Sequence, residues 1–144
     1  MNLLKIARLP AVTISPDSSV LEAVNTMVEK EVGAVVVVER DRPKGMFTQR
    51  DLLRRVAAKQ LPMALTPVSS VMTSPVKVVK PSTNGMEAVS IMVSNRFHHL
   101  PIVDDECHLL AVVSASHLLR HLVEDLSDEL RSLDAYICSD GIGG

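Results

Sequence analysis

Two short stretches of this sequence repeat the same arrangement of polar side chains, and both could hold a sugar or an anion. In GMFTQRDLL and in AVVSASHLL a hydroxyl follows an apolar run, at Thr48 and at Ser114. Three residues further on stand Asp51 in the first stretch and His117 in the second. A carboxylate has two acceptor oxygens and suits a pair of hydroxyl groups, whereas a neutral imidazole offers one acceptor and an imidazolium none.

The same arrangement also has a purely structural interpretation. Thr48-x-x-Asp51 has the form of a helix N-cap followed by an acidic residue at the third helical position, where the helix dipole favours a carboxylate. Ser114 would cap the corresponding second helix. The two interpretations are compatible, because free N–H groups at a helix N-terminus together with a hydroxyl form a natural cradle for phosphate.

Both stretches belong to a long internal repeat, and such a repeat determines the architecture. The segments SSVLEAVNTMV and TNGMEAVSIMV align Glu22 with Glu87. Each copy reads as an extended segment, an amphipathic helix, a buried strand, a polar turn, and a second strand that leads into a second helix. We therefore predict an α/β (α+β) fold built from two β-α-β-β-α repeats.

The expected organisation follows from this alignment. The units are residues 1–60 for the first repeat, 61–75 for a linker and the entry to the second, 76–126 for the second repeat, and 127–144 for a helical extension and a flexible tail. Capping boxes Ser19-x-x-Glu22 and Asn84-x-x-Glu87 are expected to begin the first helix of each copy. The extended segments AVTISP and PVKVVKP are expected to be the first strand of each copy.

Composition excludes several classes of function. The net charge is −2 with both signs interspersed, and Phe47, Phe97 and Tyr136 are the only aromatic residues, so nucleic acid is not an expected partner. No apolar run reaches the roughly 18 residues that cross a bilayer, and no signal peptide is visible, so no membrane is expected. Cys107 and Cys138 are too few for a disulfide framework, which favours a cytoplasmic protein.

The sequence contains no recognisable catalytic constellation, and we expect no enzyme. Neither a G-x-S-x-G motif nor a G-x-x-x-x-G-K-[ST] phosphate loop is present. His117 and His121 stand at i and i+4 on one predicted helix, but no Cys, Asp or Glu falls at a matching position. No metal site is therefore expected.

The two tandem repeats, each with the corner described above, resemble a pair of CBS (cystathionine β-synthase) domains in a stand-alone protein. The stretches VMTSPVKVV and NRFHHLPIVDD in the second copy are also typical of that family. The resemblance implies that the repeats pack about a pseudo-two-fold axis with a cleft on either side. It also implies a regulatory, signal-sensing module without chemistry of its own.

The resemblance further implies the ligand and its contacts. Related clefts bind AMP, ADP, ATP or S-adenosylmethionine, so no cofactor is required beyond an adenosine nucleotide as ligand, with or without Mg²⁺. Asp51 would accept hydrogen bonds from both ribose hydroxyls, and Thr48 would contact phosphate or ribose. The remaining candidates are Pro75, Val76 and Lys77 on the opposite wall, with Arg50 and His98 as anion contacts. The alternative interpretation of Lys77 and Arg50 is a solvated surface charge, and that of His98 is a packing residue at the start of a strand.

The second cleft would be built from Ser114 and His117, walled by Ala11 and Thr13. It departs from the family pattern because His117 cannot hold a diol as Asp51 can. We expect this cleft to be weak, empty or adapted to another ligand.

Beyond the second repeat, an apolar stripe continues at spacings of three and four residues through Leu122, Leu126, Leu130, Leu133 and Ile137. It either packs back on its own domain or contacts another subunit. CBS pairs usually dimerise through helices, so the resemblance implies a homodimer, with allosteric control of a protein partner. The alternative function is a ligand-free dimerisation or scaffold module.

Overall fold

The computed structural model describes residues 2–137, and its elements follow the predicted order; the expected flexible tail lies largely outside these residues. The first repeat comprises β1 (Thr13–Ile14), α1 (Val20–Lys30), β2 (Ala34–Glu39), β3 (Arg42–Thr48) and α2 (Gln49–Asp51), which continues as a π-helical segment (Leu52–Ala57). The second comprises α3 (Gly85–Asn95), β4 (His99–Val103), β5 (Leu109–Ser114) and α4 (Ala115–Ile137). Short 3-10 turns, Leu3–Lys5 and Val68–Ser70, precede the two repeats.

The first helix of each repeat is capped by the predicted residue. Ser19 Oγ accepts a hydrogen bond from the Glu22 N–H at 3.1 Å, so α1 begins as expected. Asn84 caps α3 through the N–H of Met86 at 2.8 Å, one residue earlier than the predicted contact with Glu87. Helix α1 buries Val20, which belongs to the apolar face that the helical spacing predicted.

The sheets follow the predicted strand order with one difference. Strand β1 pairs parallel to β2, β2 pairs antiparallel to β3, and β4 pairs antiparallel to β5. The expected first strand of the second repeat is reduced to a single parallel bridge between Val79 and Ile102. Pro75 and Pro81 bound this segment, and a proline cannot donate a backbone hydrogen bond to a ladder.

Each repeat pairs with the segment that leads into the other repeat. Arg8, which precedes β1, bridges to Val112 in β5, and Thr73, at the entry to the second repeat, bridges to Met46 in β3. The Thr73–Met46 bridge is closed by two backbone hydrogen bonds of 2.8 and 3.0 Å. The two bridges occupy equivalent positions of the repeat, which confirms the expected pseudo-two-fold arrangement.

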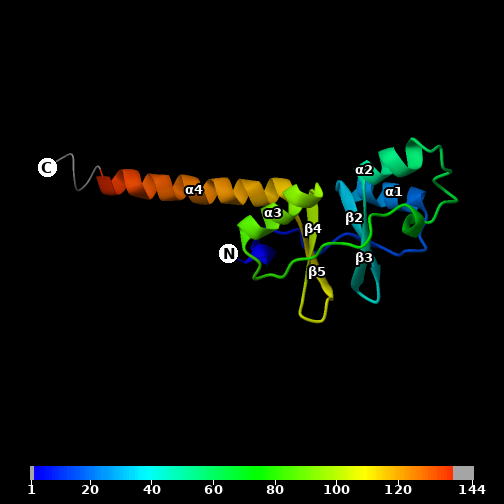
Figure 1. Ribbon diagram of the computed structural model, residues 1–144, viewed down its shortest axis with the longest axis horizontal. Coiled ribbons are helices and arrows are strands. Elements are labelled where there is room, and N and C mark those ends of the chain that lie inside the picture. Colours follow the sequence, from blue (N-terminus) through cyan, green and yellow to red (C-terminus); the bar gives the residue numbers. More distant parts are fainter. Residues whose placement is uncertain (1, 138–144) are drawn as a thin grey trace.

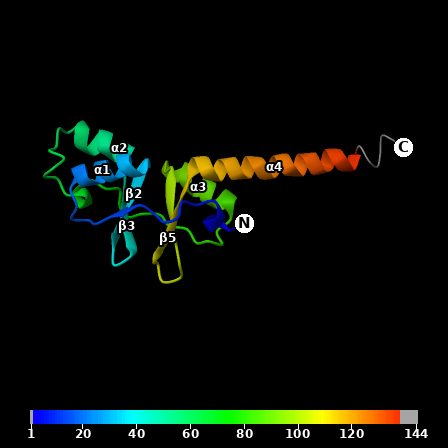
Figure 2. The ribbon, with the colours of Figure 1, turned by 180° about the vertical axis from the view of Figure 1, so that it is seen from behind.

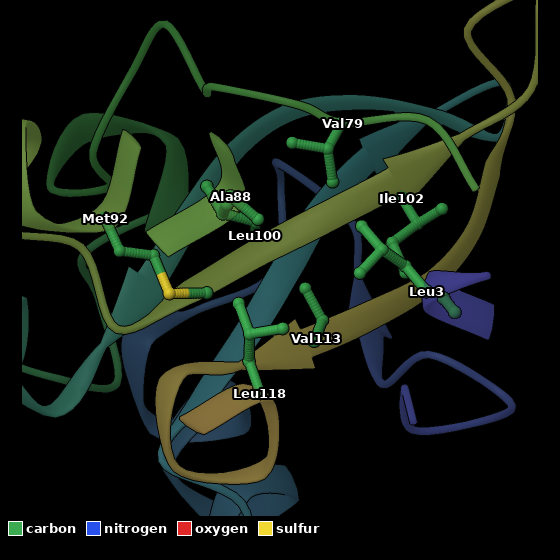
Figure 3. Packing of buried hydrophobic residues seen from close by; sticks show 9 residues of the cluster. Leu3, Val79, Ala88, Met92, Leu100, Ile102, Val113 and Leu118 are labelled. Carbon is green, nitrogen blue, oxygen red and sulfur yellow. The ribbon is translucent and has the colours of Figure 1, made fainter. Parts of the chain in front are cut away.

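Three apolar clusters hold the fold together. One lies in the second repeat and includes Leu3 from the N-terminal segment, which is fully buried with Leu100 and Leu118 (Figure 3). Another lies in the first repeat and takes in side chains from the segment before Thr73. A third joins the repeats, where Val36 and other β2–β3 residues pack with Val112. The two sheets therefore pack against each other and fix the relative positions of the two corners.

Helix α4 extends far beyond this body as a straight rod (Figures 1 and 2). Its first turns pack on α3 and β5, with Leu118 fully buried and Leu122 partly buried against the core of the second repeat. Helix α4 therefore joins the second helix of the repeat and the predicted extension in one element. Within residues 2–137, no helix is both long and apolar enough to cross a membrane.

Candidate functional site

A cavity of about 870 Å³ lies between the two repeats. Its walls are the α2 corner of the first repeat, the segment that bridges to β3, the end of α3 and the start of α4. Six of the predicted ligand-contacting residues line it: Thr48, Arg50, Asp51, Val76, Lys77 and His98. Pro75 is exposed beside Val76 and is not among the lining residues. The volume falls in the range of small-molecule sites.

The Thr48–Asp51 corner is a reciprocal capping box. Thr48 Oγ1 accepts a hydrogen bond from the Asp51 N–H at 3.2 Å, and Asp51 Oδ2 accepts one from the Thr48 N–H at 3.1 Å. The structure therefore contains the helix cap that the motif predicts. Asp51 is buried, and it is also among the residues that line the cavity.

The other oxygen of Asp51 is held by two residues that the sequence analysis did not name. Thr73 Oγ1 donates to Asp51 Oδ1 at 2.9 Å, and Arg55 Nε lies 3.6 Å from the same oxygen. Thr73 opens the stretch TSPVKV, and only its bridge to Met46 brings it to the carboxylate. The contact between Arg55 and Asp51 could have been predicted from the sequence, because residues at i and i+4 share a helix face.

Positive charge is concentrated in the cavity, although the whole chain carries a net charge of −2. Its lining includes five cationic side chains, Arg50, Arg54, Arg55, Lys77 and Arg96, and a single carboxylate, Asp51. Arg50 Nη1 donates to the Arg96 carbonyl at 3.3 Å, and Arg55 Nη1 donates to the Met72 carbonyl at 2.8 Å. The arrangement is suited to an anion of several charges.

The remaining lining is largely apolar and could accept a flat ring. Side chains from both repeats contribute to it: Met46, Val76, Val89, Met92, Val93, Phe97, Ala115 and Leu119. Ligand sites commonly combine such an apolar lining with a few placed polar groups. The cavity thus offers acceptor oxygens, cations and an apolar surface within one volume.

His98 and His99 line the same cavity, His98 being exposed and His99 half-buried at the start of β4. Burial lowers the pKa of His99 below its ordinary value of 6.5, and the nearby His98 and His117 lower that pKa further. His99 is therefore held in its neutral form.

This pKa predicts how stability depends on pH. The pKa of His99 is lower in the folded state than in the unfolded chain. The contribution of neutral His99 to the free energy of unfolding is therefore complete above about pH 6.5, and it is lost as the pH falls towards the folded-state pKa. The loss amounts to about 1.4 kcal/mol for each unit of pKa difference. Urea unfolding at pH 7.5 and pH 5.5 measures the free energy of unfolding at each pH. Its decrease between the two pH values should be smaller for His99→Asn than for the wild-type chain. An equal decrease in both proteins would contradict the assignment to His99.

The second predicted cleft has a different character. Ser114 Oγ accepts a hydrogen bond from the His117 N–H at 3.3 Å, so Ser114 caps α4 as expected. Two cavities of the described part of the chain, of about 870 and 340 Å³, include none of Ser114, His117, Ala11 and Thr13. The second of these cavities, of about 340 Å³, lies between α1 and α2 instead. Among residues 2–137, no group of three or more His, Cys, Asp or Glu side chains is placed to hold a metal ion.

Comparison with known proteins places this geometry in a family. The family described as CBS domain matches twice, at residues 5–58 and 68–124. The CBS domain-containing protein CBSX3, mitochondrial, of Arabidopsis thaliana is 34% identical over 126 residues, which are 84% of this chain and 61% of that protein. The chain thus spans less than two thirds of that relative's length.

Solved structures agree with the fold. A putative signal-transduction protein with CBS domains from Burkholderia ambifaria matches with a TM-score of 0.78 and 28% identity, covering 87% of this chain and 96% of that one. The CBS domain protein PAE2072 from Pyrobaculum aerophilum, complexed with AMP, matches with a TM-score of 0.79 and covers 89% and 99% of the two chains. At 22% identity, the match to the Pyrobaculum aerophilum protein shows only that the two chains share a fold. The chain therefore belongs to the CBS-domain family and carries a tandem pair of these regulatory ligand-sensing domains.

Proposed function

We propose that this CBS pair is a non-catalytic sensor that binds a phosphate-bearing adenosine nucleotide in the cavity between its repeats. The observation that carries the proposal is the cavity itself, which joins the Asp51 carboxylate, a group of cations and an apolar surface. The AMP bound to the Pyrobaculum aerophilum protein supports an adenosine ligand in this fold.

The ribose would be held at Asp51. A carboxylate offers about four lone-pair directions, and protein groups already occupy several of those on Asp51. The Arg55 contact is the longest at 3.6 Å, and Arg55 is the partner that a ribose hydroxyl would most readily replace. Binding would then release the Arg55 guanidinium towards a phosphate, which its fork geometry suits.

The charges of the cavity favour a phosphate group over a sulfonium. S-adenosylmethionine carries a positive sulfonium and would gain little from five cations. Each added phosphate of AMP, ADP or ATP gains from Arg54, Lys77 and Arg96, whose side chains have no hydrogen-bond or ion-pair partner within residues 2–137. We therefore expect affinity to rise from AMP to ATP and to fall with added salt.

Thermal unfolding of the chain against a ligand panel tests this proposal. The panel is AMP, ADP, ATP, adenosine and S-adenosylmethionine, each with and without Mg²⁺. A nucleotide at 100 times its Kd should add about 2.7 kcal/mol to the free energy of unfolding and raise the Tm by several degrees. S-adenosylmethionine and adenosine should shift it least.

Two variants make the panel specific. Arg96→Glu should reduce the ATP shift more than the AMP shift, whereas Lys80→Glu changes a cation outside the cavity lining and should leave both unchanged. If no nucleotide shifts the Tm, the chain is a ligand-free scaffold and the proposal is wrong. A larger shift with S-adenosylmethionine than with ATP would contradict the assignment of the ligand class.

The proposal includes a cytoplasmic homodimer that transmits nucleotide occupancy to a protein partner. Apolar side chains are exposed at equivalent positions of the two repeats, with Val28 on α1 and Val93 on α3 at 72% and 73% exposure. Equivalent exposed positions on both repeats suit a two-fold interface. Regulation requires only that the nucleotide binds two states of the complex with different affinity.

A further inference from the structure

The outer part of α4 carries exposed apolar side chains that its own domain does not cover. The outer end of this helix lies outside the body, as both views show (Figures 1 and 2). Val123, Leu126 and Leu130 are 60%, 59% and 63% exposed. A helix in globular proteins derives most of its stability from packing an apolar face, so this one lacks the surface it needs.

These side chains follow a heptad pattern. Exposed apolar residues on α4 follow one another at spacings of four, three, four, three and four positions. They are Leu119, Val123, Leu126, Leu130, Leu133 and Ile137. Alternating spacings of three and four are the a and d positions of a coiled coil. The predicted stripe began at Leu122, but that residue faces the core of the second repeat, so the exposed seam starts at Leu119 and Val123.

We infer that this seam pairs with the same seam of a second copy of the chain, as an antiparallel two-stranded coiled coil. In this register Val123 lies against the partner's Leu133, and Leu126 lies against the partner's Leu130. The stripe is then used along its full length, with Leu119 against the partner's Ile137.

The flanking charges select the antiparallel direction. Antiparallel pairing sets Arg120 opposite the partner's Asp134 on each side of the two-fold axis, which gives two attractive pairs. It brings Glu129 close to the partner's Glu129 once, which gives one repulsive pair. Parallel pairing sets Glu129 opposite the partner's Asp134 twice and provides no attraction for Arg120. Charges beside the seam determine orientation in coiled coils, because like charges repel across the interface.

The antiparallel pair also connects the assembly to the cavity. Leu119 lines the cavity and is 49% exposed, so the end of the partner's helix lies beside the nucleotide site. The two bodies stand at opposite ends of the rod. This interface is therefore separate from the contact proposed for the exposed faces of α1 and α3.

Sedimentation equilibrium of the full chain tests the pairing. Leu130→Glu places a charge at the centre of the seam and should weaken association by roughly 100-fold or more. Ser132→Glu adds the same charge on the outer face of the same helix and should leave association unchanged. The fold of the two repeats should be intact in both variants, because residue 130 is exposed in the single chain. An unchanged mass for Leu130→Glu across the concentration range would overturn the inference.

Charge reversal tests the direction. Asp134→Arg should weaken association by about three- to tenfold, because it sets an arginine opposite the partner's Arg120 at two places. The double variant Arg120→Asp with Asp134→Arg should restore the wild-type association. If Asp134→Arg alone strengthens association, Glu129 has gained an opposite charge, the pair is parallel, and the inferred antiparallel register is wrong.

Discussion

An Asp51→Ala chain should bind adenosine nucleotides about 10- to 100-fold more weakly than the wild-type chain. The hydrogen bond that a ribose hydroxyl makes to this charged acceptor contributes roughly 1.5–3 kcal/mol, and alanine removes it. Isothermal titration calorimetry with ATP, well below the Tm of the variant, measures this loss. The His117→Ala variant changes the equivalent residue of the second repeat and should keep its affinity within about twofold.

The same substitution should also lower stability, because Asp51 is part of the folded corner. It accepts hydrogen bonds from Thr48 and Thr73, and losing a helix cap of this kind costs about 1 kcal/mol. Asp51→Asn separates the two effects, since an amide oxygen can still accept from the Thr48 N–H while only one acceptor remains. A variant that loses stability but keeps its ATP affinity would assign Asp51 to the fold alone.

A Gly45→Ala chain should be less stable than the wild-type chain by about 1–3 kcal/mol, the usual cost of overpacking. A Cβ at residue 45 would lie 2.6 Å from Met72 Sδ and 2.8 Å from the Thr73 carbonyl oxygen. The methionine side chain can move away, but the carbonyl belongs to the backbone that bridges to Met46. Urea unfolding measures the loss.

The consequence should extend to the cavity. Displacing the backbone of Thr73 lengthens its 2.9 Å hydrogen bond to Asp51 and moves the wall that carries Val76. Gly33→Ala is the matched control, because a Cβ there meets the Gln49 side chain at 3.6 Å and the His99 ring at 3.8 Å, and both are ordinary contacts. Equal stability of the two variants would show that the segment at Thr73 can shift freely, which would remove the reason for a glycine at residue 45.

Local features of the sequence were sufficient to predict the helices, the paired strands of each repeat and the corner. The duplication sets the order of helices and strands, and Ser19, Asn84 and Thr48 each cap a helix because a side-chain oxygen reaches an N–H two or three residues away. The residue types at Asp51 and His117 likewise indicate two unequal corners, since the difference lies in the acceptors that each side chain carries. These features depend on neighbours within one helical turn, and periodicity and spacing contain that information.

Only the tertiary structure decided which distant residues complete the site. Thr73 reaches Asp51 because each entry segment pairs with the other repeat, and the five cations of the cavity come from both repeats. The expected strand between Pro75 and Pro81 forms just one bridge, and Leu122 turns towards the core while Leu119 remains exposed. These outcomes depend on how the two repeats pack on each other, and contacts between residues far apart in the chain leave no periodic signal in the sequence.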